Sequence, residues 1–400
     1  MWYHYAFFAI SIAMFGMTAG ALAVFLFPDF FVSQNASSHL AWGSVLFSIS
    51  VVISFLTHLC IPFVPDFSVL KFYSLALTCL IISVPFIFSG ICVCLVLTKF
   101  PRQVSALYGV DLLGSAFGCL ALVLTLDSTD AATCVLVIGF LGSFGAILFS
   151  RCLENHSFLK WAAIATFIFL GGFAYFNAVQ AAYQTPFLRI QWVKAKWEEP
   201  GIYEKWNSYS RVRVSGNPEI LTQPNGWGLS STYPLTKGIR QLNLDIDVVA
   251  ATILTFFDGD LSKLEHLKFD VTNFVHYLRN QAKVLVIGAG GGRDILSALL
   301  FGQNSVLAVE MNNHILDIVN YIFGDFTGHL DKNPKVSFVN DEARSYISRL
   351  SEKFDIVQIS LIDTWAATAA GAFVLSENSQ TEFYPFLDGT LRITRVKCTD

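Results

Sequence analysis

Charged residues are scarce in this sequence. Asp, Glu, Lys and Arg make up 14% of its 400 residues, whereas a soluble globular protein has about 25%. Hydrophobic residues reach 54%, and they are concentrated in residues 1–180. The remainder has the composition of an ordinary globular domain. This distribution argues against a wholly soluble fold and predicts a membrane half followed by one soluble domain of about 200 residues.

Long basic runs and metal-ligand spacings are also missing. The net charge is −4, so nothing indicates a nucleic-acid partner. The eight cysteines do not form a disulfide framework, and Cys92 and Cys94 are too close for the C-x₂-C spacing of a zinc site. Most cysteines lie in or beside apolar segments, where a thiol packs as a small hydrophobic side chain. We therefore expect no metal.

Six segments are apolar enough to cross a bilayer, which takes about 20 residues of helix. They are residues 4–27, 39–63, 70–98, 105–126, 132–150 and 158–178. The first lacks a basic N-terminal region, so we predict a membrane span rather than a signal peptide. Residues 1–180 are thus predicted to be a six-helix transmembrane domain in the lipid bilayer, with both ends on the same side. Flanking Lys and Arg are equally numerous on the two sides and do not set the orientation.

The fourth span contains an acid, Asp111. Gly114 and Gly118 follow it at the spacing that allows close contact between helices. A charged side chain within a membrane is a functional-site hypothesis. Asp111 lies about two turns from the helix start, so a solvated position near the membrane surface is the alternative.

Residues 181–280 are expected to hold a linker, a small β region and a helix. Alternating apolar and polar residues predict strands within 203–216 and 241–254. In 257–279 apolar residues recur at helical spacing, which predicts a helix capped by Asp260.

From residue 283 strands and helices alternate. KVLVIG (283–288) is a continuous apolar run, as is typical of a central parallel strand. Further strands are predicted at 306–310, 335–341, 354–360 and 389–395, with helices between them. This alternation predicts an α/β domain at 281–400, with a doubly wound Rossmann-like sheet covered by helices on both faces.

The stretch GAGGGRD joins the first of these strands to its helix. Gly288, Gly290 and Gly292 allow a tight turn and let a ligand approach the backbone. Glu310 ends the next strand, about 20 residues further on, where a carboxylate accepts hydrogen bonds from ribose hydroxyls. Asp294 either faces a cationic part of the ligand or caps the helix.

Asp341 ends the third strand, with Glu342 directly after it, and an acid there can accept from an adenine amino group. Acids after the second and third strands suit an adenosine without phosphates. A dinucleotide would favour G-x-G-x-x-G with its pyrophosphate on the helix N-terminus. The expected ligand is therefore S-adenosylmethionine or decarboxylated S-adenosylmethionine, used as a co-substrate.

Four stretches, in this order and spacing, resemble the spermidine synthases (polyamine aminopropyltransferases), and in particular their membrane-fused, spermidine synthase-like bacterial relatives: VLVIGAGGGRD, AVEMNN, FVNDEARSYI and FDIVQISLIDTW. The resemblance covers residues 200–395. It implies a small β domain, a class I methyltransferase-like Rossmann domain and an active site between them. It matches Glu310 to the ribose-binding acid and Asp341 to the adenine-contacting acid.

The same resemblance implies a polyamine as a second small-molecule partner. A homodimer is a further partner that we consider. It also implies an integral protein of the bacterial inner membrane. Because the expected nucleoside is cytosolic, we predict that the soluble domain is cytoplasmic.

The chain departs from that family in two places. Spermidine synthases have Asp-x-x-Asp after the fourth strand, whereas this chain has Ser360 and Asp363. A serine is a poor substitute for a general base, so ordinary polyamine synthesis is in doubt. The sequence also ends at Asp400, before the last two strands of a seven-stranded methyltransferase-like sheet, which predicts a truncated or differently completed sheet.

Two functions fit these residues. The first is a membrane-anchored transferase that moves an aminopropyl or alkyl group to an amine or another nucleophile, with Asp363 as the catalytic residue that orients or deprotonates it. The second is a non-catalytic nucleoside sensor coupled to a membrane helix bundle or transporter, which the missing first acid favours. An NAD-dependent oxidoreductase is a weaker alternative, because the glycine spacing does not match.

Overall fold

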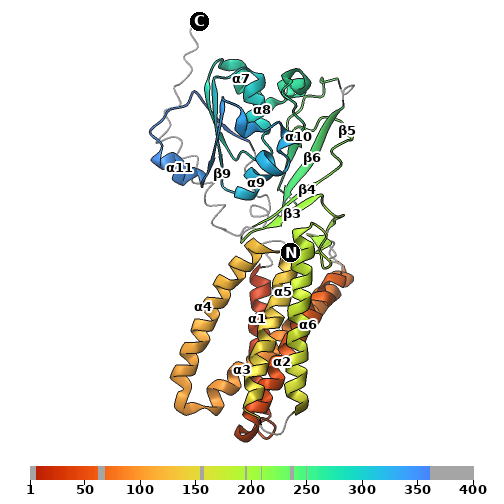
Figure 1. Ribbon diagram of the computed structural model, residues 1–400, viewed down its shortest axis with the longest axis vertical. Coiled ribbons are helices and arrows are strands. Elements are labelled where there is room, and N and C mark those ends of the chain that lie inside the picture. The colour runs from red at the N-terminus through yellow and green to blue at the C-terminus, as the bar shows by residue number, and fades with distance from the viewer. Residues whose placement is uncertain are drawn as a thin grey trace. The chain divides into compact units, whose positions relative to one another are not determined.

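The computed structural model describes most of the chain, as two compact units (Figure 1). The described residues are 6–61, 68–153, 157–193, 196–208, 210–234, 238–248 and 250–360. One unit lies within residues 1–199 and 205–211, and the other comprises 200–204 and the chain from 212 onward. The predicted middle segment, 181–280, therefore contributes to both units.

The described part of the first unit has six long helices, and each predicted span falls on one of them (Figure 1). They are α1 Ala6–Leu26, α2 Ala36–Cys60, α3 Val69–Lys99, α4 Val104–Ser128, α5 Ala131–Arg151 and α6 Ser157–Ala182. All six are long and apolar enough to cross a membrane, by length and composition. Their surfaces expose large apolar side chains, among them Phe25, Leu113 and Phe169.

Small residues set how closely the helices pack. A Cβ atom on Gly20 would lie 2.2 Å from the Ile87 carbonyl oxygen, and one on Gly90 would lie 2.3 Å from the Met17 carbonyl oxygen. Helices α1 and α3 therefore approach each other backbone to backbone, which a larger side chain at either glycine would prevent.

Helix α4 is packed differently from the other five. None of the residues in its most apolar stretch is buried, and Asp111 is exposed. No atom lies within 4 Å of the Cβ positions of Gly114 and Gly118. The helix contact that this glycine spacing predicts is therefore not made within the described chain. Figure 1 shows α4 standing apart from the bundle along much of its length.

A small β region precedes the α/β part of the chain, as predicted. Its five-stranded sheet has the order β3-β4-β6-β5, with β7 also paired to β6. The strands are β3 Tyr203–Trp206, β4 Arg211–Ser215, β5 Leu221–Thr222, β6 Ile239–Ile246 and β7 Ala250–Thr255. A separate antiparallel pair joins β1 Trp192–Val193 to β2 Lys196–Trp197.

The single helix predicted for 257–279 is wrong. The segment forms η4 Leu261–Phe269, η5 Val271–Asn273 and α7 Val275–Leu278. Asp260 does cap the first of these, by accepting from the Ser262 N–H at 3.0 Å. Asp270 is extended, with φ −97° and ψ 125°, and its carboxylate contacts the Arg293 guanidinium at 2.6 Å. This buried ion pair with another element interrupts the helix, which periodicity within the segment cannot reveal.

Four parallel strands follow, in the order β10-β9-β8-β11. They are β8 Lys283–Ile287, β9 Ser305–Glu310, β10 Val336–Asn340 and β11 Ile356–Ile359. The connecting helices are α8 Arg293–Leu300, α9 Asn313–Asp317 with a π-helical continuation Ile318–Ile322, α10 Gly324–Thr327, η7 Leu330–Lys332 and α11 Ala343–Arg349. The predicted strand at 389–395 lies outside the described residues.

Helices cover both faces of this sheet, as the continuous apolar run of β8 predicts. Val284 and Val286 pack with residues of α8 on one face. Leu285 and Ile287 pack with Ile347 of α11 on the other. After β10 the chain returns to the other side of β8, so the strand order reverses between β8 and β11. Loops at such a switch point form a crevice at the carboxyl ends of the strands, where ligands of α/β proteins bind.

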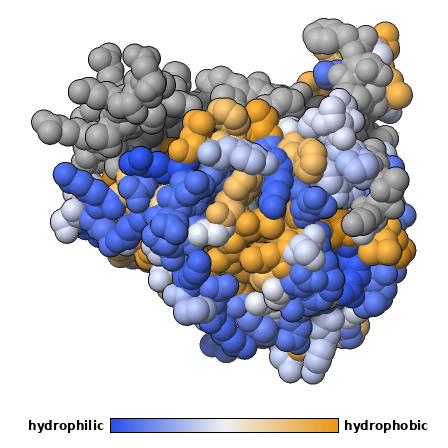
Figure 2. All heavy atoms as spheres, turned by 90° about the horizontal axis from the view of Figure 1, so that it is seen from above, coloured by the Kyte–Doolittle hydropathy of each residue, from blue (hydrophilic) through white to orange (hydrophobic). Residues whose placement is uncertain are grey.

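Figure 2 shows a face of the molecule on which hydrophilic residues cover much of the surface and apolar residues gather near the middle. The exposed surfaces of the six long helices are apolar instead. The chain thus combines helices with apolar exposed surfaces and an α/β part whose apolar side chains are buried in a core.

Gln303 links several buried groups at the amino end of the sheet. It has no exposed surface, accepts from the Ala282 N–H at 2.6 Å, and donates to His276 Nδ1 and the Arg279 carbonyl. We predict that Gln303→Leu lowers the free energy of unfolding by about 2–4 kcal/mol, because three groups lose their partner. Thermal unfolding of the detergent-solubilised chain measures this. Ser337→Ala, at an exposed site on β10, is the control. Equal stability of the two variants would contradict the prediction.

Candidate functional site

Five residues, 288–292, turn the chain from β8 into α8. Gly288, Gly290 and Gly292 have φ values of 73°, 49° and 82°. These lie in the left-handed region, which side chains other than glycine rarely adopt. The three glycines that the sequence singled out are therefore required by the backbone of this glycine loop.

Gly291 contributes through close packing instead. A Cβ atom on it would lie 2.3 Å from the Ile253 carbonyl oxygen on β7. Its N–H also faces the Thr252 hydroxyl oxygen at 3.4 Å. The glycine loop thus lies directly against β7 of the small β region. Sequence reasoning missed Gly291 and Thr252, because only the tertiary contact between the two segments makes them part of the site.

Glu310 lies at the carboxyl end of β9, against the glycine loop, and is 9% exposed. One carboxylate oxygen accepts from the Gly290 N–H at 3.1 Å, and the other from the Asn312 N–H at 3.0 Å. Burial raises the pKa of Glu310, and the backbone N–H donors oppose this effect. The structure therefore brings together the predicted acid and the predicted loop.

The Asp341 N–H donates to the Glu310 carbonyl at 3.2 Å, so the two residues are neighbours in the structure. Its carboxylate is ion-paired with Arg349. Glu342 caps α11, with its two oxygens accepting from the N–H groups of Arg344 and Ser345. Burial opposes ionisation of Glu342, but these donors outweigh it and hold its pKa below the usual value. A ligand contact by either acid stays a prediction.

Asp294 lies in the first turn of α8 and is 6% exposed. Gly292 occupies the N-cap position, so Asp294 is not the capping residue. Burial raises the pKa of Asp294, and the Ser360 side chain, directly after β11, and the neighbouring Arg293 partly counteract the effect.

A buried ion pair supports the start of α8. The Arg293 guanidinium contacts the Asp270 carboxylate at 2.6 Å, with both side chains at least nine-tenths buried. It also donates to the Thr272 hydroxyl at 2.6 Å. The sequence did not indicate this pair, because its two members are 23 positions apart, with β8 between them.

A chain of buried hydrogen bonds leads to Ser360. The His276 Nε2 forms a hydrogen bond with the Gln358 side-chain oxygen at 2.9 Å. Burial lowers the pKa of His276 and so favours the neutral imidazole. Because the Gln303 amide donates to Nδ1, the ring carries its proton on Nε2 and donates it to Gln358. The Gln358 amide nitrogen then donates to the Ser360 hydroxyl oxygen at 3.4 Å. Because the Ser360 oxygen accepts a hydrogen bond from Gln358, the hydroxyl hydrogen of Ser360 is available for donation to Asp294.

The predicted catalytic residue Asp363 lies outside the described residues, and its role stays a prediction. In the ranges that the structure describes, no three His, Cys, Asp or Glu side chains gather as they would around a metal ion.

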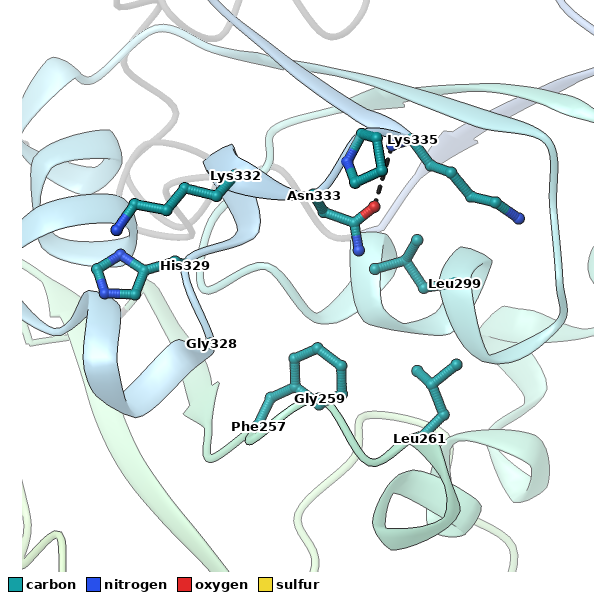
Figure 3. A pocket seen from close by; sticks show the side chains of 10 residues that line it. Phe257, Gly259, Leu261, Leu299, Gly328, His329, Lys332, Asn333 and Lys335 are labelled. Carbon is teal, nitrogen blue, oxygen red and sulfur yellow. Dashed lines mark hydrogen bonds between the residues drawn. The ribbon is translucent and has the colours of Figure 1, made fainter.

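A cavity of about 450 Å³ lies elsewhere in the second unit (Figure 3). Phe257, Leu261 and Leu299 supply apolar side chains to it, and Lys332 lies beside His329 at its edge (Figure 3). Lys335, another lining residue, directly precedes β10. The cavity is therefore near the amino ends of the strands, whereas Glu310 and Asp341 follow the carboxyl ends. None of the predicted site residues lines it.

Comparison with known proteins gives a partial similarity. No protein-family model matches the chain. A polyamine aminopropyltransferase from Korarchaeum cryptofilum (strain OPF8) is 27% identical over 88 residues, which are 22% of this chain and 27% of that protein. The chain thus matches about a quarter of the length of this curated relative. Similarity to the polyamine aminopropyltransferases is therefore present in the sequence, at low identity.

Two solved structures are also similar over part of their length. A spermidine synthase in complex with the transition state analogue AdoDATO is 17% identical, with a TM-score of 0.25, over 40% of this chain and 47% of that one. Spermidine synthase from Thermotoga maritima is 18% identical, with a TM-score of 0.26, over 42% of this chain and 50% of that one.

The raised pKa of Glu310 predicts a pH-dependent stability. Above its ordinary value of 4.5, the native protein holds a proton that the unfolded chain releases, so stability falls as pH rises through the raised pKa. Glutamine does not titrate, so the Glu310→Gln variant does not show this fall in stability with rising pH. We expect the difference in apparent Tm, variant minus wild type, to grow as pH rises and then level off. Calorimetry of the solubilised chain between about pH 4 and 8 tests this, and a constant difference would contradict it.

Proposed function

We propose that the second unit binds decarboxylated S-adenosylmethionine or S-adenosylmethionine and transfers an aminopropyl or alkyl group to an amine or another nucleophile. The observation that carries the proposal is the buried Glu310 carboxylate against the glycine loop. The partial similarity to a curated polyamine aminopropyltransferase supports the same activity.

Glu310 suits the two hydroxyls of a ribose. The backbone N–H groups of Gly290, Asn312 and Met311 donate to its carboxylate, and the two oxygens together have about four acceptor positions, so that capacity for a further donor remains. The low local dielectric around a buried carboxylate strengthens such hydrogen bonds. The positive-φ glycines leave the backbone beside it free of side chains, so that a nucleoside can approach closely.

The acids at this edge favour a cationic nucleoside over a phosphorylated one. Glu310 and Asp341 lie on one side, and Asp294 lies near the start of α8. In their ionised forms Glu310 and Asp294 would repel a pyrophosphate and attract a sulfonium, whereas the charge of Asp341 is offset by Arg349. Adenine would then lie toward Asp341, and the sulfonium toward the crevice between β8 and β11.

The transfer itself requires few protein groups. The lone pair of the nucleophile attacks the CH₂ carbon next to the sulfonium, the carbon–sulfur bond breaks, and its electron pair remains on sulfur. With decarboxylated S-adenosylmethionine the leaving group is neutral 5′-methylthioadenosine. An amine nucleophile must lose a proton, and we assign its acceptance to Asp363. Alignment of the two reactants provides most of the catalysis.

The six apolar helices are proposed to anchor this activity in a membrane, with the second unit on the cytoplasmic side, where the nucleoside is made. A non-catalytic nucleoside sensor is the second candidate. Ser360 favours it, because a hydroxyl does not act as a base near neutral pH.

We predict that Glu310→Ala abolishes binding of both nucleosides, with a loss of at least about 100-fold, because two charge-assisted hydrogen bonds disappear. Titration calorimetry of the solubilised full chain measures this. Glu352→Ala, an exposed surface site, is the control. Unchanged affinity in Glu310→Ala would contradict the proposed site.

The same preparation distinguishes the two candidate functions. Incubation with decarboxylated S-adenosylmethionine and a panel of amines should release 5′-methylthioadenosine from a transferase. Tight nucleoside binding without any such release would favour the sensor.

A further inference from the structure

Two indoles lie on one face of the β1–β2 hairpin. Trp192 and Trp197 are directly opposite each other in this antiparallel pair, and directly opposite residues point to the same face of a sheet. Their ring centroids are 5.4 Å apart, in an edge-to-face arrangement. Both residues remain exposed, Trp192 to 40% and Trp197 to 54%. A two-stranded hairpin is only marginally stable by itself in water, so this hairpin gains stability from a partner that covers the indole face, the surface of Trp192 and Trp197.

Hydrogen bonds and an ion pair fix the hairpin at its base. The Glu198 N–H donates to the Gln191 carbonyl oxygen at 2.9 Å, and the Arg189 guanidinium donates to the Glu198 carbonyl oxygen at 3.2 Å. The Glu198 carboxylate pairs with the Arg211 guanidinium at 2.6 Å, and both side chains are buried. Because breaking a buried pair leaves an unpaired charge in the interior, the base stays in place and the indole face keeps its direction.

The hairpin is linked to the end of the first unit at which α4 and α6 finish and α5 begins. Arg211 follows Ser208 closely, and the Ser208 N–H donates at 3.0 Å to the carboxylate of Asp127, the next-to-last residue of α4. Asp130 caps α5 and accepts from the Asn177 amide of α6 at 3.4 Å. Charged and polar side chains thus collect at this end, where the apolar spans stop.

Exposed aromatic residues also occur at the opposite end of α6. Phe158 and Trp161 lie in its first two turns and are exposed, and the Phe158 ring is 6.1 Å from that of Trp42 on α2. From Trp161 to the last residue of α6 the helix rises by about 30 Å, at about 1.5 Å per residue. The hydrocarbon core of a bilayer has the same thickness, about 30 Å. Indoles at both ends of such a span match the aromatic belts at the two surfaces of a membrane.

The surface around the hairpin favours lipid over a protein partner. Phe187, between α6 and β1, packs on Phe173 and Phe176 of α6, with ring centroids 6.0 and 6.2 Å apart. Phe176 and Phe187 are themselves exposed, so an aromatic surface continues from the side of α6 toward the hairpin. An indole has an apolar ring and one N–H donor, and the headgroup layer of a bilayer accommodates both.

We propose that the β1–β2 hairpin is a membrane-interface anchor, which inserts Trp192 and Trp197 into the headgroup layer of a lipid bilayer at the end of α6. The inference rests on the proposed function in one respect, the location of the six helices in a membrane. It goes further by assigning a lipid contact to a segment outside those helices. The fixed base of the hairpin then sets the depth at which this end of the bundle lies in the bilayer.

Fluorine NMR of the full chain, labelled with fluorotryptophan and reconstituted in phosphatidylcholine nanodiscs, tests the anchor. The signals are assigned by substitution, as in Trp192→Phe and Trp197→Phe. Two paramagnetic agents are compared: a gadolinium chelate attached to a lipid headgroup, and the same chelate free in water. Trp227, which is 56% exposed in the second unit, is the matched control for an indole in water.

The headgroup chelate should remove most of the intensity of the Trp192 and Trp197 signals and leave that of Trp227, because paramagnetic relaxation falls steeply with distance. The free chelate should instead broaden the Trp227 signal the most. The inference fails if the free chelate broadens Trp192 and Trp197 as strongly as Trp227, since the indole face then lies in water. It also fails if neither chelate reaches these two indoles, since protein then covers the face.

The Trp161 signal separates these failures from a failure of the proposed membrane location. Its loss to the headgroup chelate supports the membrane location, whatever the hairpin does. If the headgroup chelate leaves the Trp161, Trp192 and Trp197 signals all unchanged, the membrane location is overturned, and this inference with it. The proposed nucleoside site is tested separately by calorimetry and is unaffected by either outcome.

Discussion

The buried ion pair between Arg293 and Asp270 connects the segments on which the candidate site depends. It joins the first residue of α8 to the turn between η4 and η5, with a contact of 2.6 Å in surroundings that exclude water. Breaking such a pair leaves an unpaired charge in the interior, typically at a cost of about 3–5 kcal/mol. The start of α8 is therefore held in one position, and with it the Asp294 carboxylate and the end of the glycine loop.

The glycine loop is held from two further sides. Gly291 packs on the backbone of β7, and the Gly290 N–H binds Glu310. The three glycines adopt their positive φ values at little conformational cost. Burial of the Glu310 carboxylate, in contrast, makes its ionised form less favourable. A loop arranged in this way before any ligand arrives loses little entropy on binding, which is how preorganisation increases affinity.

The two units differ in where their apolar side chains lie. In the first, the helices expose apolar side chains and approach each other through glycines such as Gly20 and Gly90. In the second, the apolar side chains lie between a parallel sheet and its helices. The six long apolar helices of the first unit fit a membrane protein by length and composition.

The sequence by itself determined the helices, most strands and the loop that carries the site. Long apolar runs predicted six helices within a few residues of their bounds. Glu310 contacts the loop of Gly288, Gly290 and Gly292 in the structure, while the predicted role of these residues in binding a nucleoside stays a prediction. These features depend on local periodicity and on known turn chemistry, which a linear sequence displays. The tertiary structure alone decided the break at Asp270, the contact of Gly291 with β7 and the meeting of Asp294 with Ser360. Each of these joins segments far apart in the chain, and the strand order that brings them together has no periodic signature in the sequence.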